Sequence, residues 1–125
     1  MPARTPEDLD REFERALNAG DLDALAALYE PNATLTPQPG TTVSGTAAIR
    51  EALAGFLPGR PRMRITPRLV AQNGDIALVS GQWQLSMTGP DGKPAELAGR
   101  SVEVLRRQAD GHWLFAIDEP FGVNA

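Results

Sequence analysis

The spacing of the hydrophobic residues changes once along this chain, near residue 62, and this change constrains the fold more than any other feature. Before it, apolar residues recur every three or four positions, as on one face of a helix. After it, apolar and polar residues alternate, as on a strand, between short turns. Helices followed by an antiparallel meander predict an α+β fold, with about three N-terminal helices packed on a curved antiparallel sheet.

Three segments before this change have helical spacing and end signals: residues 5–20, 21–30 and 46–57. Thr5 and Asp21 are suitable N-caps, and Gly20 is suited to end the first helix. The second helix is expected to extend to Tyr29. A short strand is expected near residues 33–36.

Four strands are predicted after residue 62: residues 62–72, 76–87, 95–107 and 112–119. Asn73-Gly74 between the first two is a strong hairpin signal. Gly81 and Gly99 lie inside long strands, where glycine often marks a bend. Two such bends would curl the sheet around the helices and leave a cone-shaped hollow, the kind of place in which small ligands bind.

Length and composition exclude several kinds of site. A chain of 125 residues, 42% hydrophobic and 22% charged, suits one globular domain over residues 1–125. It has no cysteine and one histidine, His112, which excludes cysteine metal sites and clusters of histidine ligands. No metal or organic cofactor is implied. A net charge of −4 disfavours nucleic acid as a partner. The start of the chain has no long apolar run, so neither a membrane span nor a secretion signal is expected, and a cytoplasmic location is the default.

Three stretches resemble a known family: "NAGDLDALAALYEPNATLT", "GTAAIREAL" and "VEVLRRQADGHWLFAIDEP". They are similar to the NTF2-like superfamily, and within it to the SnoaL-like and ketosteroid-isomerase-like branch, over about residues 5–120. The resemblance implies a cone of helices on a curved sheet and a homodimer formed through the outer face of the sheet. It implies no single activity, because this fold hosts isomerases, cyclases, hydrolases, dehydratases and non-catalytic binding domains.

The catalytic positions of the steroid isomerases in this superfamily are not filled by matching residues. Those enzymes use an Asp base and an oxyanion hole made of a Tyr and a protonated Asp. By the resemblance, the Tyr position falls on Phe13, the base on Pro37 and the second Asp near Arg100, while a supporting Tyr is matched by Tyr29. An enzyme on this scaffold would therefore be a cofactor-independent isomerase, cyclase, or hydrolase-type lyase, and not a steroid isomerase of the usual mechanism.

An acid, Asp118, ends the apolar run of the last strand, and three interpretations of it are open. It caps the turn at the strand end, it forms a buried ion pair with Arg100, or it acts as a general acid or base in the pocket. Strict alternation places Leu114 and Ala116 on the same face as Asp118. The resemblance assigns that face to the cone.

The opposite face of the last strand carries Trp113 and Phe115, which are expected to pack against a second subunit. In the stretch "SGQWQLS", either the polar face with Gln82 and Gln84 or the face with Trp83 points inward, and the sequence leaves this open. If the polar face is inside, both glutamines would hydrogen-bond a ligand. Four arginines between residues 60 and 68 are interpreted as a solvated strand face, with a site for an anionic ligand or acidic partner as the alternative.

The sequence thus predicts a pocket for a small, largely apolar organic molecule, with Asp118 as acid or base of an isomerisation or cyclisation and Arg100 as its charge partner. Its walls are expected to come from five residues: Phe13, Tyr29, Leu53, Leu114 and Ala116. The alternative is a non-catalytic binding or dimerisation module whose cone is filled by its own side chains.

Overall fold

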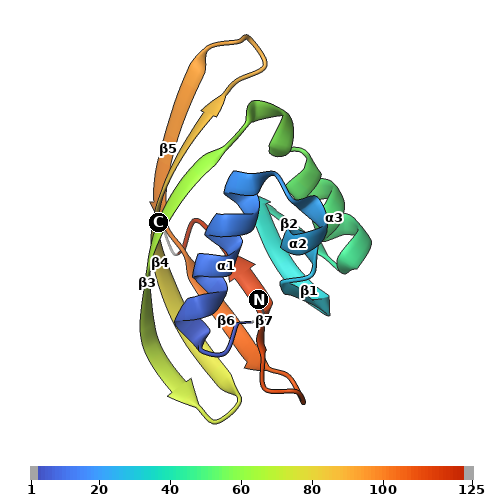
Figure 1. The fold of residues 1–125 in the computed structure, drawn as a ribbon, viewed down its shortest axis with the longest axis vertical. Helices are drawn as coiled ribbons and strands as arrows, with labels where there is room; N and C mark the ends of the chain where they lie inside the picture. The colour runs from blue at the N-terminus through green and yellow to red at the C-terminus, as the bar shows by residue number, and fades with distance from the viewer. Residues whose placement is uncertain (1–2, 123–125) are drawn as a thin grey trace.

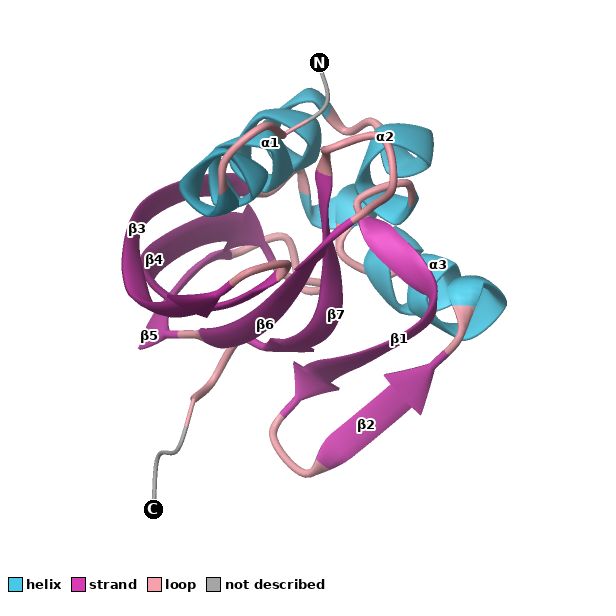
Figure 2. Ribbon diagram, turned by 90° about the horizontal axis from the view of Figure 1, so that it is seen from below, coloured by secondary structure: helices cyan, strands magenta, loops and turns pink. Residues whose placement is uncertain are grey.

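In the computed structural model, which describes residues 3–122, helices cover one face of a curved sheet (Figure 1). In chain order the elements are α1 (Pro6–Ala19), α2 (Leu22–Ala26), β1 (Tyr29–Gln38), β2 (Thr41–Ser44), α3 (Thr46–Ala54), the short 3-10 helix η1 (Leu57–Gly59), β3 (Arg62–Asn73), β4 (Ile76–Thr88), β5 (Pro94–Arg100), β6 (Val102–Arg107) and β7 (Trp113–Glu119). Seen from below, the three α-helices lie on the same side of the sheet, and β3 and β4 curl beneath α1 (Figure 2). The predicted α+β cone is confirmed.

Within the described residues the sheet is mixed, with the order β2-β1-β7-β6-β4-β3, and β5 pairs with β4. All pairs are antiparallel except β1 and β7, which run parallel, so the prediction of a purely antiparallel sheet is wrong at this pair. The first part of β4 pairs with β6 and the second part with β5. The strand predicted over residues 95–107 is therefore two strands, divided at Ser101, whose backbone N–H donates to the Gly81 carbonyl at 2.7 Å.

The helix ends follow local chemistry, with one exception. Thr5 Oγ1 accepts from the Asp8 N–H at 3.3 Å, and Asp21 Oδ1 accepts from the Ala24 N–H at 3.0 Å, as their N-cap positions predict. The second helix, however, ends at Ala26 and not near Tyr29. Tyr29 begins β1 and pairs with β7, because the tertiary pairing overrides the helical spacing of the apolar residues.

The last strand does not alternate as predicted, because it contains a β-bulge. Leu105 of β6 pairs with Phe115, whereas the preceding Val104 pairs with Ile117, so Ala116 is the extra residue. The bulge leaves Ile117 exposed and turns the next residue, Asp118, to the inside.

This bulge corrects the predicted faces of β7. Trp113 and Phe115 are buried in the core under the helices, and not on the outer face. Leu114 and Ala116 are only half-buried and do not line the cavity described below. The carboxylate of Asp118 therefore shares the interior with Phe115.

Gly99 accommodates the indole of Trp83, its partner across β4 and β5. A Cβ atom at residue 99 would lie 2.6 Å from Cζ2 of Trp83. The indole cannot shift freely, because its Nε1–H donates to the Pro120 carbonyl at 2.6 Å. The predicted importance of this glycine thus comes from aromatic packing.

Gly99→Ala is expected to lower the free energy of unfolding by about 1–3 kcal/mol, since the added methyl group overpacks the Trp83 ring. Urea unfolding followed by tryptophan fluorescence measures the change. The matched control is Ala98→Ser at the exposed neighbouring position, where a change within about 0.5 kcal/mol is expected. Equal effects of the two substitutions would contradict the packing argument.

Candidate functional site

A cavity of about 430 Å³ lies between the helices and the concave face of the sheet. Its walls are mostly apolar and include Phe13, Leu53, Ile65, Leu85 and Phe115. It reaches solvent beside β5, since Leu97, which is 51% exposed, is among the lining residues. The volume lies in the range of small-molecule pockets, so the cone is not filled by its own side chains.

Three carboxyl groups from three different elements line this cavity: Asp10 of α1, Glu103 of β6 and Asp118 of β7. They are 1%, 5% and 5% exposed. Glu103 and Asp118 are direct partners across the two strands, and such side chains have Cβ atoms about 4.5–5.5 Å apart. None of the described residues that line the cavity is a lysine, arginine or histidine. Like charges thus meet inside the protein without a cation.

Two hydroxyl groups hydrogen-bond to this acid cluster, defined as Asp10, Glu103 and Asp118. Tyr29 Oη donates to Asp118 Oδ2 at 2.5 Å. Ser101 Oγ donates to Glu103 Oε2 at 2.5 Å and accepts from the Gly81 N–H at 2.8 Å. Asp10 Oδ2 and Glu103 Oε1 are buried and have no donor when both groups are ionised, so a hydrogen bond between the two side chains exists only when one carries a proton.

Burial is the main cause of shifted pKa values in the cluster. It raises the pKa of Asp118 to about 7; the Tyr29 hydrogen bond lowers this pKa in part, while the charges of Asp10 and Glu119 raise it. Burial, followed by the hydrogen bond and negative charge of Asp10, raises the pKa of Glu103 well above its ordinary value. Burial also raises the pKa of Asp10, against the hydrogen bond from Glu103 and the charge of Arg11. Near neutral pH the cluster therefore holds protons that exposed carboxylates would release.

Gly81 allows these groups to approach the sheet. A Cβ atom at this position would lie 2.9 Å from Asp10 Oδ2 and 2.9 Å from Ser101 Oγ. The glycine sits where β4 changes its partner from β6 to β5. A position predicted as a bend thus also makes room for the buried acids.

The predicted ion pair between Asp118 and Arg100 is wrong. Arg100 is exposed and pairs in register with Gln82, which is also exposed, as is Gln84. All three side chains belong to the outer face, because the alternate residues of β4, including Trp83, are buried. The interpretation with Gln82 and Gln84 as ligand contacts is therefore also corrected.

Of the other predicted wall residues, Phe13 and Leu53 line the cavity. Tyr29 is buried behind it, where its ring lies 5.0 Å from that of Phe115 and its hydroxyl reaches Asp118. Pro37, which the resemblance matches to the isomerase base, also lines the cavity.

Asp10 and Glu103 were not among the residues predicted for the site. A signal for Asp10 was present, because Phe13 and Leu17 follow it at i+3 and i+7 and place it on an apolar helix face. No such signal marks Glu103. Its neighbours Val102 and Val104 suggest that the opposite face of the strand is the buried one.

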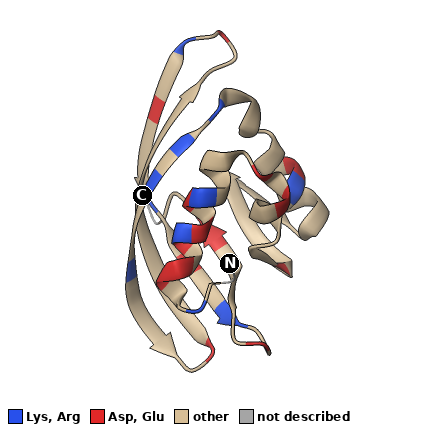
Figure 3. Ribbon diagram, in the orientation of Figure 1, with Lys and Arg blue, Asp and Glu red and all other residues tan. Residues whose placement is uncertain are grey.

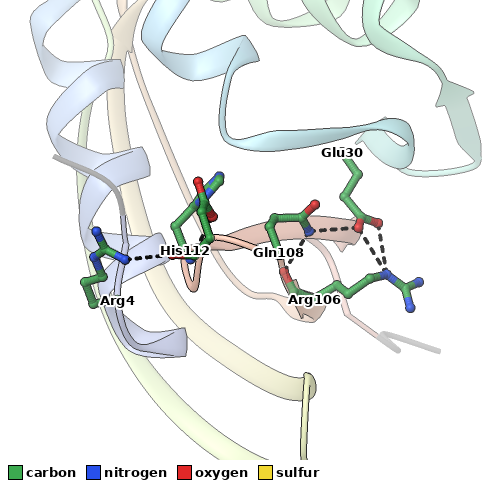
Figure 4. Close-up of polar contacts among 6 residues, drawn as sticks. Arg4, Glu30, Arg106, Gln108 and His112 are labelled. Atoms are coloured by element: carbon green, nitrogen blue, oxygen red, sulfur yellow. Dashed lines mark hydrogen bonds and ion pairs between the residues drawn. The ribbon is translucent and has the colours of Figure 1, made fainter.

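Charged residues elsewhere are solvated or paired. The arginines of β3 are exposed along the strand, as predicted, and acidic residues gather on α1 (Figure 3). At the β6–β7 hairpin, Glu30 accepts from Arg106 Nε at 3.1 Å and from Gln108 Nε2 at 2.9 Å, and Arg4 Nη1 donates to the Asp110 carbonyl at 3.1 Å (Figure 4). These contacts tie β1 and the N-terminal segment to the hairpin. In the part of the chain described, no helix is long and apolar enough to cross a membrane, and no group of three or more acidic or histidine side chains is arranged to hold a metal ion.

Comparison with known families agrees with this architecture. The family model of the SnoaL-like domain matches residues 10–115, which is most of the chain. The chain belongs to the SnoaL-like family. The match includes Asp10 and Glu103 of the acid cluster and ends three residues before Asp118.

Solved structures with the same fold are distant in sequence from this SnoaL-like chain. A ketosteroid isomerase-like protein from Erwinia carotovora atroseptica has a TM-score of 0.80 at 20% identity, over 95% of this chain and 94% of that one. A candidate dehydratase of the NTF2-like family from Streptomyces avermitilis has a TM-score of 0.78 at 20% identity, over 94% and 93%. An NTF2-like superfamily protein from Salmonella enterica serovar Typhimurium has a TM-score of 0.82 at 14% identity, over 95% and 89%. At these identities the comparisons establish the fold.

The stability of the SnoaL-like domain is expected to fall as Asp118 ionises. Because its pKa is higher in the folded than in the unfolded chain, its contribution is fully present below the ordinary value of 3.8 and is lost as the pH rises toward about 7. The Asp118→Asn variant lacks this loss. The unfolding free energy of the variant minus that of wild type should therefore be about 2–3 kcal/mol larger at pH 8 than at pH 5. Urea unfolding at both pH values measures this difference.

Arg100→Gln is the control for this prediction, since Arg100 is exposed and lies outside the cavity. It should leave the NMR titration of the Asp118 carboxyl carbon unchanged. A titration of Asp118 near pH 4 in the wild-type protein would contradict the proposed effect of burial.

Proposed function

We propose that this protein binds a small, largely apolar organic molecule in its cavity and that Asp118 transfers a proton to and from it. One observation carries the proposal: an unfilled apolar cavity ends on buried carboxyl groups that have no cationic partner among the residues described. Buried acids with perturbed pKa values in a pocket are typical of sites that bind or react.

Asp118 is suited to exchange protons near neutral pH. A carboxyl with a pKa of about 7 is present in both its basic and its acidic form at that pH, which is the condition for efficient general acid–base catalysis. Tyr29 fixes its Oδ2 atom by a 2.5 Å hydrogen bond, which leaves the second oxygen for the ligand. As carboxylate, Asp118 would take a proton from an acidic carbon of the ligand, and as acid it would return that proton to another carbon, which is an isomerisation.

Glu103 supports this chemistry as a protonated neighbour. Its raised pKa keeps the acid form at neutral pH, and the acid form can donate a hydrogen bond where negative charge develops on the ligand. Proteins of this fold described as ketosteroid isomerase-like and as a candidate dehydratase are consistent with such proton transfers. The alternative is a binding protein that uses the same cavity without catalysis.

Proton transfer is expected to appear as exchange of the α-protons of a bicyclic ketone such as 2-tetralone in D₂O, followed by ¹H NMR. Asp118→Asn should slow the protein-dependent exchange by about 10²–10⁴-fold, the usual contribution of a general base. Glu96→Gln, on the exposed part of β5, is the matched control and should exchange like wild type. Binding of the ketone without any exchange above the buffer rate would favour the non-catalytic alternative.

The predicted homodimer is also part of this proposal, with a different contact from the one expected. Leu78, Val104 and Ile117 are register partners across β4, β6 and β7 and form an apolar row on the outer face. Ile117 is 47% exposed, and such a row is suited to pack against a second copy. Light scattering during size-exclusion chromatography should give the mass of a dimer for wild type and of a monomer for Ile117→Lys, whereas a wild-type monomer would disprove the pairing.

A further inference from the structure

We infer that the natural ligand of the cavity is an apolar amine, bound with its protonated nitrogen among Asp10, Glu103 and Asp118 and its hydrocarbon part against the apolar walls. This inference deepens the binding part of the proposed function by naming the ligand class, and it rests on the cavity being the binding site.

The ionisable side chains among the described residues that line the cavity are all acidic. Each acid comes from a different element, and the described lining residues include no side chain that could neutralise it. Outside the cavity the opposite holds, since Glu30 pairs with Arg106, Asp75 with Arg107 and Asp23 with Arg50. Buried charges are ordinarily paired, so the missing cation is the feature that a ligand would supply.

Two oxygen atoms of the cluster have no donor from outside the cluster. Asp10 Oδ2 and Glu103 Oε1 are both fully buried and receive no hydrogen bond from any other group that the structure describes, so within the chain only a proton shared between the two carboxyls satisfies them. Both side chains belong to the cavity lining. The other oxygens of the cluster are oriented from behind, by Tyr29 on Asp118 and by Ser101 on Glu103. An ammonium group has three N–H donors and no acceptor, which matches these oxygens once the carboxyl groups are ionised.

The rest of the cavity selects the remainder of the ligand. Its walls are aromatic and aliphatic side chains, including Phe13, Leu53 and Phe115, which favour a hydrocarbon body. An anionic ligand would be repelled by the cluster. A small hydrated cation is disfavoured because the apolar walls cannot replace its water shell.

Binding of an ammonium group would change the protonation of every acid around it. The groups that face the cluster are Tyr29 from β1, Glu119 beside Asp118 on β7, and the exposed Arg11 beside Asp10 on α1. Of these only Arg11 is cationic, and it lies at the surface. A bound cation would favour the carboxylate forms, so its affinity should rise with pH while the amine stays protonated. A neutral ligand that accepts hydrogen bonds from protonated acids should show the opposite dependence.

The experiment compares two isosteric probes, 1-naphthylmethylamine and 1-naphthalenemethanol, on the full chain. Dissociation constants are measured by calorimetry at pH 5.5 and pH 8, and NMR shifts of the Phe13 and Leu53 side chains locate the probe. The amine should bind at least about tenfold tighter than the alcohol at pH 8, which corresponds to one charge-assisted contact. The affinity for the amine should also be higher at pH 8 than at pH 5.5.

Variants test whether the preference comes from the cluster. Glu103→Gln and Asp10→Asn should each remove most of the preference for the amine while binding of the alcohol is kept or improved. Glu96→Gln removes an exposed acid and should change neither affinity. If a cluster variant fails to fold, as judged by circular dichroism, the comparison of the two probes on wild type still decides the inference.

The outcomes separate this inference from the proposed function. If both probes bind in the cavity and the alcohol binds as tightly as the amine, the amine inference is overturned and the apolar pocket stands. If the amine preference is present but persists in both cluster variants, the cluster is not its source and the inference is again overturned. If neither probe shifts a cavity resonance, the binding function fails together with the inference.

Discussion

The structure depends on the burial of three carboxyl groups at the end of an apolar cavity. Moving an ionised carboxylate out of water without a partner is among the most unfavourable events in folding, and a protein normally avoids it by pairing or protonation. Here Asp10, Glu103 and Asp118 converge, and within residues 3–122 only two hydroxyl groups donate to them. The raised pKa values are the direct consequence, because protonation is the one relief that the folded chain itself provides.

The scaffold brings these groups together through irregularities in otherwise regular strands. The bulge at Ala116 turns Asp118 inward, opposite Glu103. The break at Ser101 ends β5 and begins β6, and it places the serine hydroxyl beside Glu103. Gly81 removes the side chain that would collide with Asp10. Each deviation costs some regular pairing, and together they form the polar end of the cavity, in keeping with the general placement of bulges and strand glycines near binding sites.

The site also differs from that of the steroid isomerases, which use an Asp base and an oxyanion hole made of a Tyr and a protonated Asp. By the resemblance, that Tyr and that base fall on Phe13 and Pro37, which line this cavity and carry neither a hydroxyl nor a carboxyl group. Protonated and ionised carboxyls are nonetheless both available here, from different elements. The same fold thus presents acid–base groups from new positions, which is how one architecture carries several chemistries.

The three helices, the N-caps of the first two and the hairpin at Asn73-Gly74 were predictable from the sequence, because they depend on contacts between residues close in the chain. The presence of an acid in the last strand was equally visible. The partner of that acid was not, since Arg100 and Tyr29 are both distant in sequence and only the strand register decides which one faces inward. A single bulge reverses the face of every later residue in a strand, and no local pattern marks it. The sequence alone determined the α+β cone and its apolar interior, whereas the tertiary structure decided that the cavity ends on three carboxyl groups, because that convergence depends on long-range pairing.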